Sequence, residues 1–293
     1  MKNVVIFLLL MLTWNSASTQ TVADSHAANT RDPLVKDLSF HSVSLQRDMR
    51  YRVLLPQHYG NYGRFPVLYL LHGVYGDYLN WDTRTGLEKY ARDLDLLVVM
   101  PDADDSWYTN SATVPEDKFE DYIAKDLVSE IDEKFRTLRE RHGRGIAGLS
   151  MGGYGAVKLA IKYPDLFAAA GSLSGALNAA QNLDRLRPEF GAKLLEVFGK
   201  EGSPERAAND PFLLLKVPSQ DHPYPYFYLS CGTADFFLET NRKFAAQLSS
   251  RGIAYEYHET PGAHAWDYWD RELGPMLRAV HGILAHPERL HGR

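Results

Sequence analysis

Cysteine is the scarcest residue type in this sequence. Cys231 is the only cysteine among 293 residues, which excludes an intramolecular disulfide. It stands in the apolar run Tyr226–Cys231, where a free cysteine behaves as a small buried hydrophobe. We therefore expect a structural thiol that takes no part in chemistry.

The sequence also lacks an excess of basic residues. It has 32 Lys and Arg against 37 Asp and Glu, a formal net charge of −5, whereas binding to nucleic acid needs a basic face. Neither a zinc-ligand motif nor a phosphate-binding glycine loop occurs, so no metal and no cofactor are predicted. The acidic stretch Asp102–Asp105 lacks the glycine and the terminal glutamate of a calcium-binding loop, and we interpret it as solvated.

No apolar run is long enough to cross a bilayer, which takes about 20 residues. Val4–Leu12 is apolar, Lys2 precedes it, and small residues follow at Ser16–Ser18. This pattern predicts a signal peptide at residues 1–18 and a flexible leader at 19–33. It also predicts export, either to the periplasm or out of the cell. Stable membrane insertion after cleavage is not expected, although an uncleaved anchor remains the alternative.

Short apolar runs bounded by turn residues predict the strands. Phe40–Leu45 alternates in polarity like a strand, and Tyr51–Leu55 follows it and ends at Pro56. The two are expected to pair antiparallel. The other runs are continuously apolar, as in parallel strands that are buried on both faces. These runs are Pro66–Leu71, Leu94–Met100, Gly145–Leu149, Ala168–Leu173, Tyr226–Cys231 and Ile253–Tyr257.

Helical periodicity falls between the strand runs. It predicts helices at Lys118–Leu138, Met151–Lys162, Leu238–Ser250 and Met276–Ala285. Alternating strands and helices predict an α/β fold: a mostly parallel sheet flanked by helices on both faces, with antiparallel N-terminal strands. We expect one domain over residues 34–288.

Residues 178–225 interrupt this alternation with many Pro and Gly residues and a short helix near Lys193–Phe198. The segment has too few apolar residues for a separate domain. We interpret it as a cap-like insertion over the carboxyl edge of the sheet, where open α/β sheets bind ligands.

Gly148–Gly152 reads G-L-S-M-G and matches the G-x-S-x-G motif. Such a match arises by chance in a chain of this length with a probability of roughly 0.1, so the context decides its meaning. It follows a predicted buried strand and opens a predicted helix, as a nucleophile elbow requires. Gly148 and Gly152 would relieve the crowding around a strained Ser150.

A serine nucleophile needs a base, and the base needs an orienting carboxylate. His264 lies in a loop just after the run Ile253–Tyr257, where an imidazole can reach Ser150. Asp235 follows the run Tyr226–Cys231 at the same sheet edge, although it is also a good helix N-cap. The rival carboxylates are Asp210, Asp221 and Glu239, and the rival histidines are His258, His281, His286 and His291.

The loop after Leu71 is the expected source of a second oxyanion donor. In folds with a nucleophile elbow, one N–H comes from the residue after the serine and the other from this loop. The predicted pair is therefore the N–H groups of Met151 and Val74. His72 precedes Gly73 and is interpreted mainly as shaping the loop.

At these positions the chain resembles the esterase family that includes S-formylglutathione hydrolases of the esterase D type, feruloyl and acetyl xylan esterases, tributyrin esterases and the antigen 85 mycolyltransferases. The resemblance covers about residues 38–285. It rests on Leu70–Trp81, Gly148–Ala156, Cys231–Asp235 and Pro261–His264. It implies the α/β-hydrolase fold, a Ser150, Asp235 and His264 triad, and oxyanion donors at Val74 and Met151.

Differences from two groups within this family narrow the set of members that the chain resembles. S-formylglutathione hydrolases commonly carry His before the serine and Gly-His-Gly after it, where this chain has Leu149 and Tyr154. Antigen 85 proteins carry Asp at the position of His72. The pattern is most similar to tributyrin-type and carbohydrate-acyl esterases.

Aromatic residues near the motifs suggest the substrate. Tyr75, Trp107 and Trp266, together with His72, are predicted to contact a sugar-linked or phenolic ester, although ordinary packing at the rim would also explain the aromatics. The first hypothesis is a carboxylesterase for short-chain or aromatic acyl esters. The alternatives are an acyltransferase, an S-formylglutathione hydrolase-like thioesterase and a non-catalytic binding protein. Acyl chain length, alcohol and oligomeric state stay open.

Overall fold

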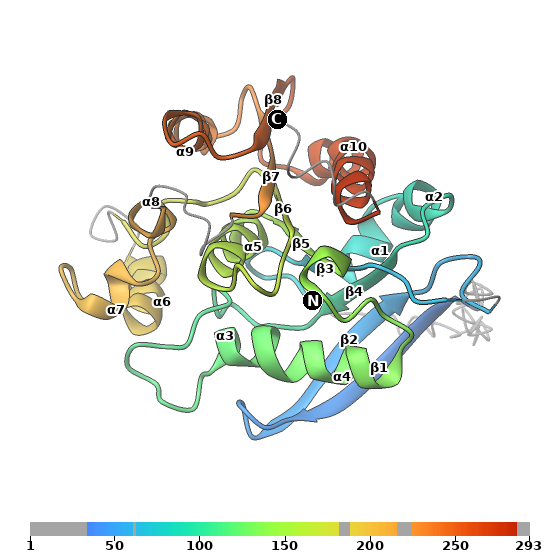
Figure 1. Cartoon of the computed structure of the whole chain (residues 1–293). Helices are drawn as coiled ribbons and strands as arrows, with labels where there is room; N and C mark the ends of the chain where they lie inside the picture. Colours follow the sequence, from blue (N-terminus) through green and yellow to red (C-terminus); the bar gives the residue numbers. More distant parts are fainter. Residues whose placement is uncertain (1–33, 61–62, 182–187, 216–223, 286–293) are drawn as a thin grey trace, which may run out of the picture. The chain divides into compact units, whose positions relative to one another are not determined.

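An eight-stranded sheet forms the centre of the protein (Figure 1). The computed structural model describes residues 34–60, 63–181, 188–215 and 224–285. The predicted signal peptide and leader lie outside the described residues. Within the described ranges no helix is both long and apolar enough to cross a membrane.

The strands are arranged in the order β1-β2-β4-β3-β5-β6-β7-β8. All neighbours from β4 to β8 run parallel, whereas β1 pairs antiparallel with β2, and β2 with β4. This confirms the predicted sheet. The strands are β1 Val35–Ser42, β2 Arg47–Leu54, β3 Val67–Leu71, β4 Leu97–Pro101, β5 Arg144–Leu149, β6 Ala169–Leu173, β7 Tyr226–Gly232 and β8 Tyr255–Thr260.

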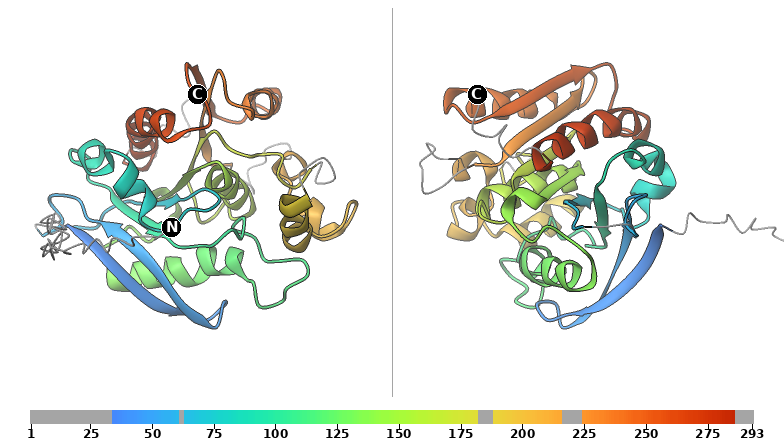
Figure 2. Two further views of the ribbon diagram at one scale, coloured as in Figure 1. Left: turned by 180° about the vertical axis from the view of Figure 1, so that it is seen from behind. Right: turned by 45° about the vertical axis from the view of Figure 1, so that its right-hand side comes forward.

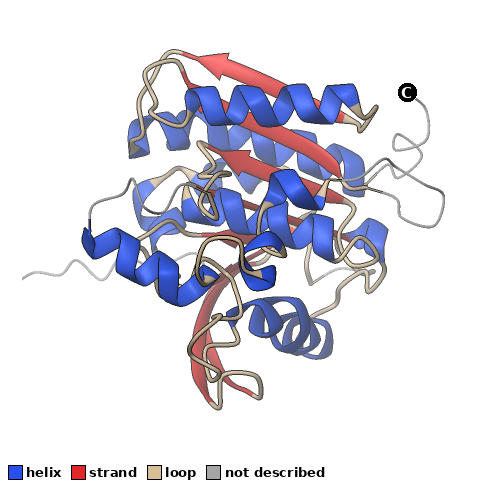
Figure 3. Cartoon of the chain, turned by 90° about the vertical axis from the view of Figure 1, so that its left-hand side faces the viewer, coloured by secondary structure: helices blue, strands red, loops and turns tan. Residues whose placement is uncertain are grey.

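Helices cover both faces of the sheet, as predicted (Figures 2 and 3). Side chains alternate along each strand, so Tyr69 packs into one core and its neighbours Leu68 and Leu70 pack into the other. The Tyr69 core is covered by α3 Phe119–Asp121, η1 Tyr122–Leu127, α4 Val128–Lys134, α5 Met151–Lys162 and α9 Leu238–Ser250. The Leu68 core is covered by α1 Asn80–Arg84, α2 Leu87–Ala91 and α10 Trp266–Leu284.

Two predicted helices match their observed bounds, and two do not. Helices α5 and α9 have the predicted ends. Helix α10 begins at Trp266 and not at Met276, because Pro275 is tolerated inside a helix whose buried face packs on the sheet. The helix predicted to reach Leu138 ends at Lys134, because Leu138 donates its N–H to the carbonyl of Phe65.

The first predicted strand is also displaced. It spans Val35–Ser42 and not Phe40–Leu45, because the chain turns after Ser42. The Ser42 hydroxyl accepts the N–H of Leu45 at 3.1 Å and donates to Asp126 at 2.6 Å, which closes the turn.

The described part of the segment 178–225 contains α6 Pro188–Phe198, α7 Pro204–Ala207 and α8 Pro211–Leu214. Tyr154 of α5 donates its hydroxyl to the carbonyl of Asn209 at 2.6 Å, which ties this segment to the helix that follows Ser150. Val197 and Phe198 pack with Tyr154 in a small separate core. The segment therefore rests on the nucleophile side of the sheet.

Candidate active site

Ser150 occupies a strained turn between β5 and α5. Its φ of 51° and ψ of −114° lie outside the regions that L-residues favour. A Cβ on Gly148 would lie 2.5 Å from the Gly152 carbonyl carbon, and one on Gly152 would lie 2.3 Å from the Leu71 carbonyl oxygen. Only glycine therefore fits at both positions, and the turn presents Ser150 at the carboxyl end of the sheet.

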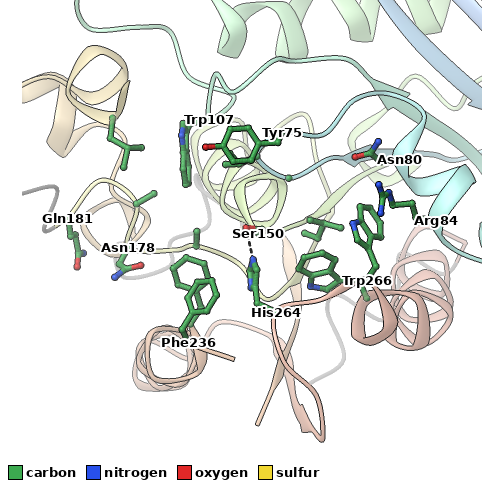
Figure 4. Close-up of a pocket in the computed structure, with 18 residues that line it drawn as sticks. Tyr75, Asn80, Arg84, Trp107, Ser150, Asn178, Gln181, Phe236, His264 and Trp266 are labelled. Atoms are coloured by element: carbon green, nitrogen blue, oxygen red, sulfur yellow. Dashed lines mark hydrogen bonds between the residues drawn. The ribbon is translucent and has the colours of Figure 1, made fainter. Parts of the chain in front are cut away.

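Three side chains from distant segments form one hydrogen-bonded chain. His264 Nε2 lies 3.0 Å from Ser150 Oγ (Figure 4). His264 Nδ1 lies 2.9 Å from Asp235 Oδ2. A carboxylate only accepts hydrogen bonds, so Nδ1 carries the proton and Nε2 is left to accept from the serine hydroxyl. The arrangement can therefore remove a proton from Ser150.

Asp235 is buried and held as an anion. Burial raises the pKa of its carboxyl, but hydrogen bonds from His264 and from the Phe237 N–H outweigh burial and hold the pKa below its usual range. The Phe237 N–H donates to Oδ1 at 2.8 Å, which leaves Oδ2 for the imidazole. Asp235 is not the N-cap residue of α9, which is Phe237.

The rival carboxylates have other partners. Asp210 caps α8 by accepting the Phe212 N–H at 2.9 Å. Glu239 is an exposed ion-pair partner of Arg242. Asp221 lies outside the described residues. The structure therefore brings only Asp235, among the described candidates, to His264.

The two described rivals of His264 lie away from Ser150. His258 is within β8 and stacks on Tyr228, while its Nε2 contacts Glu256 at 3.2 Å. His281 lies within α10. His286 and His291 fall outside the described residues. Cys231 is fully buried, and burial raises the pKa of its thiol to about 12, as suits a structural cysteine.

Gly73 brings the loop after β3 against the nucleophile. A Cβ at Gly73 would lie 3.5 Å from Ser150 Cβ and 2.6 Å from the Leu149 side chain. The next residue, Val74, lines the same cavity as Ser150. Among the described residues, neither the Val74 N–H nor the Met151 N–H has a hydrogen-bond partner. Both groups are thus available to an oxyanion beside Ser150.

His72 does not line the cavity, so its predicted contact with substrate is wrong. The side chain is 1% exposed. Nδ1 donates to the Gly73 carbonyl at 2.8 Å, and Nε2 accepts the Ala103 N–H at 3.1 Å. Burial lowers the pKa of His72 and favours this neutral form. Its role is to join the loop after β3 to the loop after β4.

A cavity of about 920 Å³ opens at Ser150 and His264 (Figure 4). Tyr75, Trp107 and Trp266 line it, as predicted from their positions near the motifs. Sequence reasoning missed further lining residues, whose places depend on long-range packing. They are Asn80, Arg84, Leu149, Ala176, Asn178, Ala179, Gln181, Leu194, Phe236, Phe237 and Trp269.

Aromatic rings enclose His264. Its ring centroid lies 4.5 Å from that of Phe236, 5.4 Å from that of Phe237 and 4.9 Å from that of Trp269. Phe236 and Phe237 directly follow Asp235 in the sequence. This adjacency could have indicated that both rings lie beside the predicted catalytic residues. The rings hold the imidazole plane between Ser150 and Asp235.

Known proteins share this sequence pattern and fold. A family model described as "Putative esterase" matches residues 42–280. An acetyl esterase of Caldicellulosiruptor saccharolyticus is 26% identical over 260 residues, which cover 82% of this chain and 95% of that protein. Esterase Rv1288 of Mycobacterium tuberculosis is 32% identical over 270 residues, covering 81% of this chain and 57% of that protein.

Among solved structures, the fluorophosphonate-binding serine hydrolase F of Staphylococcus aureus, with substrate bound, is 30% identical. The match covers 84% of this chain and 98% of that chain, with a TM-score of 0.76. The family match spans both the nucleophile turn and the histidine loop. The chain therefore belongs to the Putative esterase family, has the α/β-hydrolase fold and is a carboxylic ester hydrolase.

Proposed function

We propose that this protein is an exported serine carboxylesterase that hydrolyses short-chain or aromatic acyl esters through an acyl-enzyme on Ser150. The observation that carries the proposal is the hydrogen-bonded chain from Ser150 Oγ through His264 to Asp235. A serine hydroxyl is a weak nucleophile without such a base. The strained turn at Ser150 holds the hydroxyl at the mouth of the cavity.

In the first half of the reaction, Ser150 Oγ attacks the ester carbonyl carbon while His264 Nε2 takes the hydroxyl proton. The carbonyl oxygen becomes an oxyanion, which accepts hydrogen bonds from the N–H groups of Val74 and Met151. Donors at the N-terminus of a helix such as α5 stabilise this charge. The C–O bond to the alcohol then breaks, and His264 returns the proton to the alcohol oxygen.

In the second half, water replaces the alcohol. His264 takes a proton from water as its oxygen attacks the acyl carbon, and the second oxyanion forms at the same two N–H groups. The bond to Ser150 Oγ then breaks, Oγ regains a proton from His264, and the carboxylic acid leaves. Asp235 stays ionised and stabilises the imidazolium in both halves.

The cavity walls favour a small or flat acyl ester. About 920 Å³ is within the range of small-molecule sites, which is ~300–1,000 Å³. Trp107 and Trp266 line the cavity, and aromatic rings suit a sugar or an aromatic acid. An acetyl esterase is among the relatives. Carbohydrate-linked acetyl and feruloyl esters are therefore the substrates to test first.

Export is supported by the sequence alone. Lys2, the apolar run Val4–Leu12 and the small residues Ser16–Ser18 form the pattern of a signal peptide. Fractionation of the native host, with N-terminal sequencing of the exported protein, tests this part. Mature protein that begins near Thr19 outside the cytoplasm supports it, and intact cytoplasmic protein contradicts it.

The mechanism is tested on Ser150. We expect Ser150→Ala to lower kcat by at least ~10³-fold, as the loss of a triad member does elsewhere. Ser129→Ala is the matched control, because Ser129 is exposed on α4 and bonds only Glu133. Labelling with a fluorophosphonate followed by peptide mass spectrometry should place the adduct on Ser150. Turnover near wild type in Ser150→Ala would disprove the mechanism.

The substrate is tested with p-nitrophenyl esters from acetate to palmitate, methyl ferulate and acetylated xylan. A maximum at short or aromatic acyl groups supports the proposal, and a maximum at palmitate contradicts it. Added sugar or lipid alcohols distinguish hydrolysis from transfer. Ester formation that outpaces release of free acid would favour an acyltransferase.

A further inference from the structure

Arg84 is a cation in the wall of the cavity. It is the last residue of α1 and is exposed. Its guanidinium carbon lies 5.6 Å from the centroid of the Trp266 ring. Figure 4 shows Arg84 on the same flank as Trp266, while Gln181 and Asn178 lie on the opposite flank beyond Ser150. The cavity therefore has one flank with a positive charge.

No counter-charge is available to Arg84 in the cavity. The described residues that line it include no Asp and no Glu, and Arg84 is the one lining residue with a permanent charge. No carboxylate of the described residues lies within ion-pair distance of Arg84. The protein as a whole has a net charge of −5, so the positive charge in this cavity is a property of the cavity and does not follow from the overall charge.

Carboxylates close to α1 are held by other groups. Asp82 is the ion-pair partner of the buried Arg52. Asp270 accepts the N–H of Gly86 at 2.7 Å. Neither carboxylate is a partner of Arg84, whose side chain lines the cavity.

The position of Arg84 is fixed by its helix. Trp81, one turn earlier in α1, is buried and donates its indole N–H to the Leu71 carbonyl at 3.0 Å. Its ring packs edge-on against Trp266 at 5.8 Å. Leu71 is the last residue of β3, and the loop that contains Val74 follows it directly. Through Trp81, Arg84 is therefore held by the strand whose following loop lies beside Ser150.

We propose that Arg84 makes the enzyme selective for esters that carry a carboxylate remote from the scissile bond, bound on the Trp266 flank. The inference rests on the proposed hydrolysis at Ser150. A planar guanidinium binds a carboxylate through two parallel N–H donors. A single cation balances the one negative charge of a carboxylate, whereas it would leave one charge of a phosphate dianion unbalanced. The stack on Trp266 restricts the side chain before substrate arrives.

The test compares kcat/KM for matched esters with and without the charge. The acyl pair is p-nitrophenyl hydrogen adipate and p-nitrophenyl hexanoate, and the alcohol pair is 4-acetoxybenzoate and its methyl ester. We expect wild type to prefer the anion in one pair, and Arg84→Gln to lower that preference about 10-fold or more. Arg84→Lys should keep part of the preference, and Lys243→Gln, an exposed charge change on α9, should keep all of it.

The outcomes separate this inference from the proposed function. Wild type that hydrolyses neutral esters without preferring the anion in either pair overturns the role of Arg84 and leaves hydrolysis at Ser150 intact. An equal loss on charged and neutral esters in Arg84→Gln also overturns it, because the residue would then only support Trp266. Stronger use of 4-acetoxyphenyl phosphate than of 4-acetoxybenzoate overturns the assignment to a carboxylate.

Discussion

Gly152 rests directly on Leu71: a Cβ on Gly152 would lie 2.3 Å from the Leu71 carbonyl oxygen. This contact joins the first turn of α5, which contains Met151, to the last residue of β3, whose following loop contains Val74. The atom approached is backbone, so no rotamer change relieves the crowding. The spacing between Met151 and Val74 therefore depends on the absence of a side chain at Gly152.

Gly152→Ala should impair both activity and stability. The added methyl must push α5 away from β3, and a displacement of about 1 Å in a catalytic site costs on the order of 10²-fold in rate. We expect a loss of that size in kcat/KM and a lower melting temperature, measured with p-nitrophenyl acetate and by calorimetry. Gly60→Ala is the control, because a Cβ there has nothing within 4 Å. Equal behaviour of the two variants would contradict the argument.

Asp235→Asn should lower kcat by ~10³–10⁴-fold with little change in KM, because the amide no longer stabilises the imidazolium. Asp210→Asn is the matched variant, since Asp210 caps α8. It should keep kcat and lose at most about 1 kcal/mol of stability. Activity retained in Asp235→Asn and lost in Asp221→Asn would assign the acid to Asp221.

His72→Leu should destabilise the protein without removing any group that touches substrate. The change leaves the buried Ala103 N–H without its partner, at a cost of about 1–3 kcal/mol, whereas the Gly73 carbonyl keeps the N–H of Gly76 as a donor. Urea unfolding measures the loss, and kcat should fall more than KM rises because the Val74 loop shifts. His41→Leu, on the exposed surface, is the control. Unchanged stability in His72→Leu would refute the structural role.

Acid should destabilise the fold through Glu120. Burial raises the pKa of this carboxyl, but Lys158 and Lys162 outweigh burial and hold it at about 2, below the ordinary 4.5. A lowered carboxyl pKa contributes stability above pH 4.5 that is lost as the pH falls toward 2. The contribution is on the order of 3 kcal/mol at neutral pH.

Urea unfolding from pH 3 to pH 7 tests the Glu120 prediction. The free energy of unfolding should rise with pH less steeply in Glu120→Gln than in wild type. Glu133→Gln, an exposed position on α4, should follow the wild-type curve. Parallel curves for wild type and Glu120→Gln would show that the Lys158 cluster does not shift the titration.

Much of the framework could be predicted from the sequence. Strands buried on both faces must be continuously apolar, so the runs that became β3, β5, β6 and β7 stood out between turn residues. Helix α5 was bounded by the Gly-rich turn and by Pro164, and its predicted ends were right. A strand that is buried on both faces requires an apolar residue at each position, and this requirement can be seen in consecutive residues of the sequence.

The prediction failed where long-range contacts overrode local pattern. Pro275 suggested a helix start, but packing of α10 on the sheet stabilises a helix that continues through it. His72 was expected beside substrate, whereas two backbone groups, one of them 31 residues away, hold it inside the protein. Gly73 is the next residue, but the distant partner, Ala103, could not be identified from the residues around His72.

By itself the sequence determined the type of chemistry, because Ser150, Asp235 and His264 each lie in the turn or loop that follows a strand run, and the carboxyl ends of parallel strands meet at one edge. Only the tertiary structure decided what surrounds that chemistry. Arg84 and Trp266 are far apart in the chain, yet their side chains stack in one cavity wall. Such a contact depends on how both helices pack against the sheet, so it cannot be predicted from the hydrophobic periodicity of either helix.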